Sequence, residues 1–125
     1  MKFAIKIEPT FTIIAPEVEV LNKEVGAALL VKVNEEIRNN PYPSIVVDLS
    51  MVSQLLNESI TDILSIQEAI ELSNGIIVFT CLQEFVLQKV KQERLHLSIH
   101  VATTIEDAQE LIDKEKVSRS MLNEL

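Results

Sequence analysis

The residues best placed to do chemistry lie between a predicted buried strand and a predicted helix. The strand is the apolar run Ile45–Val47, and Asp48 ends it. A polar turn, SQLLNESITD, follows over residues 53–62. Its carboxylates can accept hydrogen bonds from amides or basic groups, and its serine hydroxyls can accept a phosphoryl group. We therefore expect this turn to act as a binding surface or as a site of modification.

Glu58 lies where the first turn of the following helix is expected. A carboxylate there faces unpaired backbone N–H groups and the positive end of the helix dipole, which is worth about 0.3 to 1 kcal/mol. The residue can therefore simply stabilise the helix, or it can present a fixed negative charge to a partner. One carboxylate reproduces only part of the field of a phosphoserine, which carries about −1.5 to −2 charges.

Ser59 is the nearest hydroxyl, and two roles are open for it. A one-residue shift of the turn would present it to a kinase as a phosphosite. Alternatively, Ser59 and Asp62 have the spacing of a capping box, with Asn57 as the rival N-cap. Capping is the more common role for a serine in this position. In either case we expect Asn57, Glu58 and Ser59 to face solvent at the start of the helix.

Asp48 has the place of the phospho-accepting aspartate of a receiver domain, at the end of a central strand. The further acidic ligands and the lysine that a receiver needs are missing from the corresponding positions. We therefore expect its carboxylate to accept hydrogen bonds from the turn that follows.

The remaining reactive residues predict no catalytic, cofactor or metal site. His96 and His100, if both are extended, lie about 13 Å apart along a strand, too far to share a zinc ion, so we interpret them as surface histidines. Cys81 is the one cysteine, which excludes an internal disulfide, and a packed, unreactive thiol is expected. Gly26 and Gly75 are the only glycines, and neither belongs to a phosphate-binding loop.

Composition and charge limit the classes of partner. The chain has 125 residues, which fits a single domain over 1–125, and 47% of them are hydrophobic. Its 19 acidic and 11 basic residues give a net charge of −8, which disfavours nucleic acid and anionic membrane and favours a partner with a basic face. The N-terminus alternates in hydropathy and predicts neither a signal peptide nor a membrane span, so a cytoplasmic location is expected.

The elements that must position the turn follow from hydrophobic periodicity. Strands are predicted over residues 2–7 and 11–15 as an antiparallel hairpin, over 45–47 and 76–79 as the two central strands, and over 97–101 nearer an edge. Helices are predicted from residue 21 to about 38, from 60 to near Asn74-Gly75, where Asn74 or Gly75 supplies a left-handed cap, and from 82 to 90. A fourth helix is predicted to start at the threonine cap of Thr103-Thr104, with Ala108, Leu111 and Ile112 facing the core. The order ββαβαβαβα indicates an α/β fold, a mixed sheet with a parallel centre and four helices.

The turn and its flanks resemble the STAS family, the anti-sigma factor antagonists. The resemblance covers about residues 3–112 and depends on Asp48-Leu49-Ser50, Val52, Leu55 and Ile60, and on the later Thr103-Thr104-Ile105-Glu106-Asp107-Ala108. It implies a STAS-like fold and a non-enzymatic, bacterial regulator of transcription. The implied partner is an anti-sigma factor that is also a serine protein kinase; in that family the unphosphorylated antagonist binds this kinase and so frees a sigma factor.

In that family the turn carries Asp-Ser-Ser-Gly, and the partner kinase phosphorylates the second serine. Those four positions correspond to Leu56, Asn57, Glu58 and Ser59, so the chain diverges at every one of them. Glu58 occupies the phosphoacceptor-equivalent position and cannot be phosphorylated; Ser59 is the shifted candidate. The residues expected to contact the partner are Ser53, Leu56, Asn57, Glu58, Ser59 and Asp62.

Residues 113–125 lie outside the resemblance and are expected to form a C-terminal helical extension. Val117, Met121 and Leu125 recur at four-residue spacing, with Leu122 beside them. This stripe can pack on its own domain, fray or join a second subunit, and we favour packing on its own domain. The chain is accordingly expected to be a monomer or a weak homodimer.

Three hypotheses for function remain. The first is an antagonist-like module that binds an anti-sigma factor kinase through residues 53–62. The second is a divergent, non-phosphorylatable STAS scaffold within a sensory complex. The third, from a different class, is a domain that binds a small ligand or nucleotide in a crevice at the end of the sheet.

Overall fold

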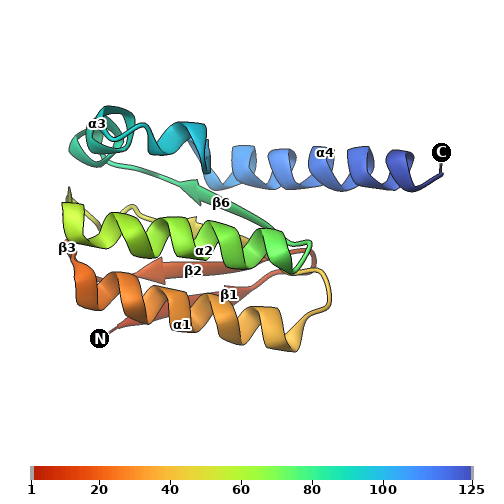
Figure 1. The fold of residues 1–125 in the computed structure, drawn as a ribbon, viewed down its shortest axis with the longest axis horizontal. Coiled ribbons are helices and arrows are strands. Elements are labelled where there is room, and N and C mark those ends of the chain that lie inside the picture. The colour runs from red at the N-terminus through yellow and green to blue at the C-terminus, as the bar shows by residue number, and fades with distance from the viewer. Residues whose placement is uncertain (1, 125) are drawn as a thin grey trace.

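Strands and helices alternate along the chain and form a five-stranded mixed sheet with helices on both faces (Figure 1). The computed structural model describes residues 2–124, and the side chains of residues 2–121. The strands are β1 (Phe3–Ile7), β2 (Thr12–Pro16), β3 (Val20–Leu21), β4 (Ser44–Asp48), β5 (Gln54–Leu55), β6 (Ile76–Thr80) and β7 (His100–Ala102). The helices are α1 (Lys23–Asn39), α2 (Ile60–Leu72), α3 (Glu84–Gln92) and α4 (Ile105–Glu124), with 3-10 turns η1 (Asn57–Ser59) and η2 (Leu95–Leu97).

The main sheet has the order β1-β2-β4-β6-β7, and β4 lies at its centre. β1 pairs antiparallel with β2, which confirms the predicted hairpin, and the other neighbours are parallel. β4 and β6 are covered on both faces, which is why their sequences are apolar without alternation. The predicted pair of parallel central strands is therefore confirmed.

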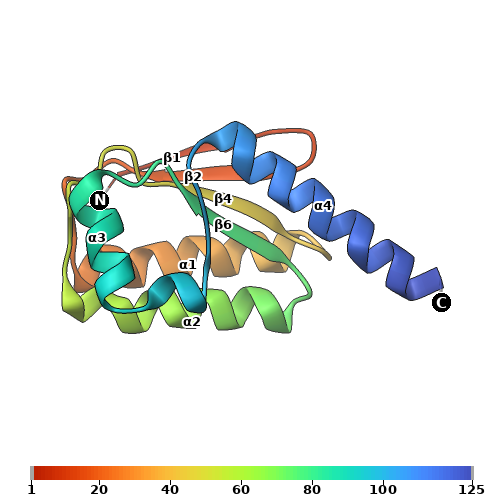
Figure 2. The same ribbon diagram turned by 90° about the horizontal axis from the view of Figure 1, so that it is seen from above.

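Helices α1 and α2 lie on the opposite side of the sheet from α4 (Figure 2), and each face of the sheet carries a hydrophobic cluster. On one face α1, α2 and α3 pack over the larger cluster, which includes Leu29, Ile66 and Phe79. On the other face α4 places Ala108 and Ile112 against Val46 and Val78 of the central strands, with Leu111 partly buried beside them. This arrangement confirms the α/β class and the predicted core face of α4.

The strand predicted over residues 97–101 begins later than expected. Leu95 is buried and begins η2, whereas Leu97 is exposed, and extended pairing starts only at His100. The cause is the backbone at Arg94, which adopts a left-handed φ of 55° and turns the chain after α3. His96 and His100 are therefore not on one strand, although both are exposed, as predicted.

Two short strands, β3 and β5, were not predicted. They pair in parallel and form a separate two-stranded sheet. A strand of two residues carries too little periodicity to be recognised in a sequence. Its second strand, β5, lies within the predicted functional turn of residues 53–62, so this small sheet affects the conformation of the turn.

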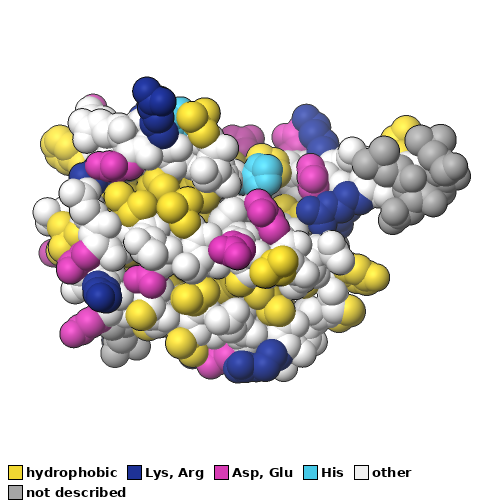
Figure 3. All heavy atoms as spheres, viewed as in Figure 1, with side chains coloured by type: hydrophobic (Ala, Val, Ile, Leu, Met, Phe, Trp, Pro, Cys, Tyr) yellow, Lys and Arg dark blue, Asp and Glu magenta, His cyan; other side chains and the backbone are white. Residues whose placement is uncertain are grey.

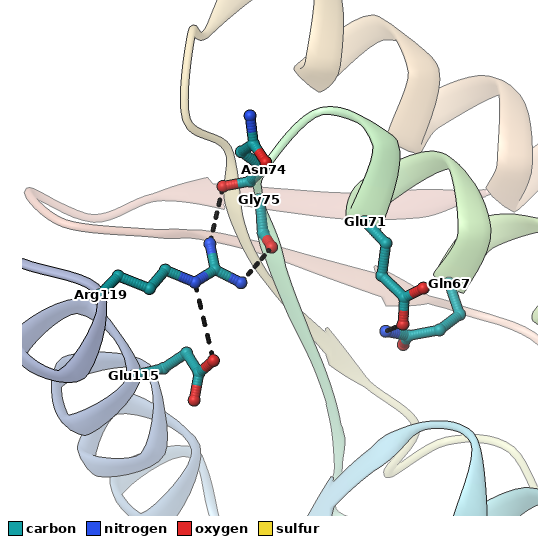
Figure 4. A network of polar contacts seen from close by, with 6 residues as sticks. All are labelled: Gln67, Glu71, Asn74, Gly75, Glu115 and Arg119. Carbon is teal, nitrogen blue, oxygen red and sulfur yellow. Dashed lines mark hydrogen bonds and ion pairs between the residues drawn. The ribbon is translucent and has the colours of Figure 1, made fainter. Parts of the chain in front are cut away.

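The connection from α2 to β6 turns at Asn74, and the C-terminal half of α4 contacts it through Arg119 (Figure 4). Asn74 supplies the left-handed residue, with φ of 59°, as predicted for one of two positions. Arg119 donates from Nη1 to the Asn74 carbonyl oxygen at 2.8 Å and from Nη2 to that of Gly75 at 3.2 Å. The Arg119 side chain therefore attaches α4 to this turn through backbone carbonyls.

Within the part of the tail whose side chains the structure describes, the apolar packing that we predicted from the sequence is absent. Val117 and Met121 are 59% and 62% exposed, and α4 continues past the ends of the central strands β4 and β6 (Figure 2). The contacts back to the body are polar, from Arg119 and from Lys116 Nζ to the Thr10 carbonyl oxygen at 3.2 Å. The side chains of Leu122 and Leu125 lie outside the described residues.

Gly75 lies so close to Pro43 that a residue with a Cβ atom would not fit, so substituting Gly75 tests the conformation of this turn. A Cβ atom there would lie 2.6 Å from the Pro43 carbonyl oxygen and 2.7 Å from Pro43 Cγ. Because a backbone atom must move to relieve the contact, we expect Gly75→Ala to lower the free energy of unfolding by about 2 kcal/mol. Urea denaturation measures it, with Asn74→Gly as the control that should change little. An unchanged midpoint for Gly75→Ala would contradict the close contact.

Candidate functional site

The chain that leaves β4 is held by one local hydrogen bond and by one from a residue distant in sequence. Asp48 Oδ1 accepts from the Ser50 amide at 2.9 Å, which confirms the predicted role of this carboxylate. Gln83, just before α3, donates from Nε2 to the Ser50 carbonyl oxygen at 2.8 Å. Leu49 and Val52 are buried on either side of the exposed Ser50 and Met51. The start of the connection is thus fixed against the body and against α3.

The segment from Ser53 to Leu56 is positioned by the small sheet. The amides of Ser53 and Gln54 both donate to the Glu19 carbonyl oxygen, at 2.8 and 3.1 Å, and the Leu56 amide donates to Leu21 at 3.1 Å. Ser53 Oγ also donates to the Glu19 carbonyl oxygen at 3.2 Å. Residues distant in sequence therefore set the conformation of the turn before η1 begins.

Asn57 and Glu58 are exposed on η1, as predicted, but Ser59 is not. Ser59 is 0% exposed, and its hydroxyl donates to the Leu56 carbonyl oxygen at 2.8 Å. The expectation that all three side chains face solvent is therefore wrong for Ser59.

The capping box predicted for Ser59 is also absent. Ser59 has φ −90° and ψ −11°, a helical rather than an extended conformation, and its side chain makes no bond to the amides of α2. An N-cap serine needs extended backbone to reach those amides. The 3-10 turn takes over this role in part, because the Ser59 and Ile60 amides donate to the carbonyl oxygens of Leu56 and Asn57.

The first turn of α2 lies close to α1. A Cβ atom on Gly26 of α1 would come within 2.7 Å of Asp62 Oδ2. The Asp62 side chain is therefore packed beside α1 and only half exposed. Of the six predicted contact residues, the structure presents Ser53, Asn57 and Glu58 on the surface, leaves Leu56 and Asp62 half-buried, and buries Ser59.

A shallow open groove separates this turn from α3. One wall is formed by residues 53–57 and the other by Phe85, Gln88, Lys89 and Gln92. Phe85 is 75% exposed, and Met51 is 51% exposed in the connection that Gln83 holds against α3. The sequence pattern counted Phe85 with the apolar residues of the third helix and did not distinguish it from Val86 and Val90, which are buried.

Acidic and apolar side chains share the surface around α2 and α3. Figure 3 shows hydrophobic side chains gathered between these two helices, with acidic side chains beside them. The basic Lys89 in the groove is paired with Glu93 at 3.4 Å, so it adds little free positive charge. Together with Glu58, this composition suits a partner surface that combines apolar and basic groups.

Cys81 lies at the same end of the sheet as Asp48 and is half-buried. Burial raises the pKa of the thiol; the Thr80 hydroxyl opposes this, and the carboxylates of Asp48 and Glu106 raise the pKa further. The thiol is therefore protonated at neutral pH and a poor nucleophile. Among the described residues there is no cluster of three or more metal-ligating side chains. None of the helices within residues 2–124 is long and apolar enough to span a membrane.

The comparison with solved structures places this geometry in a known fold. A candidate anti-sigma factor antagonist from Thermotoga maritima is 25% identical, with a TM-score of 0.78 over 89% of this chain and 94% of that chain. A variant of the RsbS protein from Moorella thermoacetica is 14% identical, with a TM-score of 0.74 over 95% and 99% of the two chains. The anti-sigma factor antagonist SpoIIAA in its unphosphorylated form is 12% identical, with a TM-score of 0.65 over 92% and 98%.

No protein-family model matches the chain, and no curated protein sequence matches it either. The fold is nevertheless that of the STAS domain, a class of regulatory module, as the resemblance in the sequence predicted. Within that class, the structural neighbours include anti-sigma factor antagonists, and they also include a part of the anion transporter Slc26a9.

Proposed function

We propose that this chain is a non-enzymatic regulatory module that binds a protein partner through residues 53–62 and the adjoining groove along α3. The observation that carries the proposal is the exposure of Asn57 and Glu58 on a turn whose backbone is fixed by bonds to Glu19 and Leu21. A surface held in one conformation loses little entropy on binding, which favours recognition by a partner.

The partner class is an anti-sigma factor with serine kinase activity, and the setting is the cytoplasm of a bacterium. The STAS fold and the antagonists among the structural neighbours support this assignment. The acidic Glu58, beside exposed apolar side chains, supports a partner with basic and apolar groups at its contact surface.

A second candidate, a scaffold without a phosphorylation switch, is favoured by a specific observation. Glu58 stands at the phosphoacceptor-equivalent position, and the neighbouring Ser59 hydroxyl is buried and already bonded. A kinase cannot reach that hydroxyl without opening η1. Both candidates use the same binding surface, and they differ in whether the partner can modify it.

The test of the binding surface is affinity capture from host lysate with three forms of the protein. Glu58→Lys reverses the charge at the proposed contact on η1, and Glu68→Lys makes the same change in net charge on α2, away from that contact. We expect wild type and Glu68→Lys to recover the same kinase-class protein, and Glu58→Lys to recover at least tenfold less, because it places positive charge against a basic surface. Equal recovery by all three proteins would place the site elsewhere.

The same captured partner separates the two candidates. It is incubated with the purified chain and ATP, and the intact mass of the chain is measured before and after. Addition of one phosphoryl group to wild type but not to Ser59→Ala would support the switch. An unmodified chain that still binds the partner would support the scaffold.

A further inference from the structure

β1 is an open edge of the main sheet. It is the terminal strand in the sheet order, and β2 is its hydrogen-bonded neighbour. The C-terminal half of β1 carries apolar side chains at the surface, with Ile5 48% and Ile7 80% exposed. An edge strand with exposed apolar residues is a template for pairing with another strand.

The hydrogen bonds of the hairpin show which backbone groups of β1 are free to pair. The Glu17 amide donates to the Lys2 carbonyl oxygen, and the Glu8 amide donates to that of Phe11. In an antiparallel pair, residues alternate between those that bond to the neighbour strand and those that point away from it. The even-numbered residues therefore bond to β2, and the amides and carbonyls of Phe3, Ile5 and Ile7 point outward along the open edge.

We propose that β1 pairs antiparallel with β1 of a second copy of this chain, about a two-fold axis at Ile5. In this register Ile5 lies opposite Ile5 of the second copy, and Phe3 lies opposite Ile7. All of these residues have outward-pointing backbone groups, so each pair exchanges two hydrogen bonds. Their side chains lie on one face, because side chains alternate along a strand, and they form a continuous apolar stripe across the junction.

Charge selects this register over its neighbours. With Ile5 on the axis, Lys2 lies opposite Glu8 of the second copy, an attractive pair. A shift by two residues in one direction places Lys2 opposite Lys6, and in the other direction places Lys6 opposite Lys6, which are repulsive pairs. Glu8 already pairs with Lys6 of its own chain at 3.1 Å, but Lys6 is 74% exposed, so that ion pair is weak. In this register two copies of β1 therefore match in their backbone hydrogen-bonding groups, their apolar side chains and their charges.

The resulting dimer has a ten-stranded sheet if both copies keep the order observed here, with α1 and α2 of both copies on the same face, because the two-fold axis is perpendicular to the sheet. β1 contributes nothing to the groove between residues 53–57 and α3. The inference therefore does not depend on the proposed function, and it assigns the dimer contact to β1 rather than to the tail of α4.

A disulfide trap tests the register directly. In a Cys81→Ser background, Ile5→Cys places two thiols at opposed positions about 5.5 Å apart between Cα atoms, within the range that a disulfide spans. Ile7→Cys in the same background is the matched control, because its two copies lie about 13 Å apart along the strands. We expect mild oxidation of the native protein to give at least tenfold more linked dimer with Ile5→Cys. Equal linking of the two variants would overturn the proposal.

Sedimentation of the full chain tests the same contact without a covalent bond. Ile5→Lys places two like charges opposite each other, and we expect it to raise the dimer dissociation constant at least tenfold while circular dichroism stays unchanged. Val117→Lys is the control at the exposed stripe of α4 and should leave the dimer intact. A wild-type chain that remains monomeric at millimolar concentration, or a dimer that only Val117→Lys weakens, would refute the β1 contact.

Discussion

Replacing Ser59 with aspartate should lower the free energy of unfolding by about 3 kcal/mol at pH 7. Ser59 is 0% exposed, so the new carboxylate would be removed from water. A charge near the start of α2 gains only about 0.3 to 1 kcal/mol from the helix dipole. The desolvation cost is larger than the gain from the helix dipole, so the substitution lowers the free energy of unfolding. Urea denaturation at pH 7 is the measurement.

The pH dependence of this loss identifies its cause. Burial would raise the pKa of the introduced carboxyl above its unfolded value of about 3.9. Unfolding then releases a proton, so the stability deficit grows as the pH rises from about 4 to the folded pKa and is largely absent below about pH 3. Ser59→Asn, which is similar in size but uncharged, should show no such dependence. A Ser59→Asp protein as stable as wild type at pH 7 would mean that the side chain reaches solvent and would restore Ser59 as a phosphosite.

Replacing Phe85 with alanine should weaken binding of the proposed partner about 30-fold, which corresponds to the roughly 2 kcal/mol typical of an aromatic hot spot. The ring is 75% exposed and forms a wall of the groove opposite residues 53–57. A partner that covers Glu58 would therefore bury it. Because the ring contributes little to the core, the thermal midpoint should be almost unchanged.

Leu72→Ala is the matched control for the Phe85 variant. Leu72 is 80% exposed at the far end of α2, so it removes a similarly exposed apolar side chain away from the groove. Titration calorimetry with the purified partner compares the two. If Phe85→Ala binds as tightly as Leu72→Ala while Glu58→Lys has lost binding, the contact includes the turn but excludes α3.

The regular elements could be predicted because their signals are local. The unbroken apolar runs of β4 and β6 indicate coverage on both faces, and Asn74 indicates the end of α2. The predicted threonine cap of α4 is likewise present, and the structure identifies it as Thr104, whose Oγ1 accepts from the Asp107 amide at 3.1 Å.

The site was predicted less completely because its conformation depends on distant residues. Carbonyl oxygens of Glu19 and Leu21 fix the backbone before η1, and this determines that Ser59 points inward. Phe85 and Val86 are adjacent and both apolar, so only the position of neighbouring elements decides which one is buried. Sequence spacing places a residue on a helix, but it does not reveal which side chains of that helix the neighbouring elements cover.

Glu58 gives the surface a negative charge as part of the sequence itself. A serine at this position would be neutral and would gain a negative charge only while it is phosphorylated. A kinase and a phosphatase can reverse the state of a hydroxyl within the lifetime of a molecule, but neither enzyme can alter a carboxylate. If this turn engages the proposed partner, each copy is synthesised in its final state. The response is then set by the number of copies relative to the partner, so control passes to synthesis and turnover.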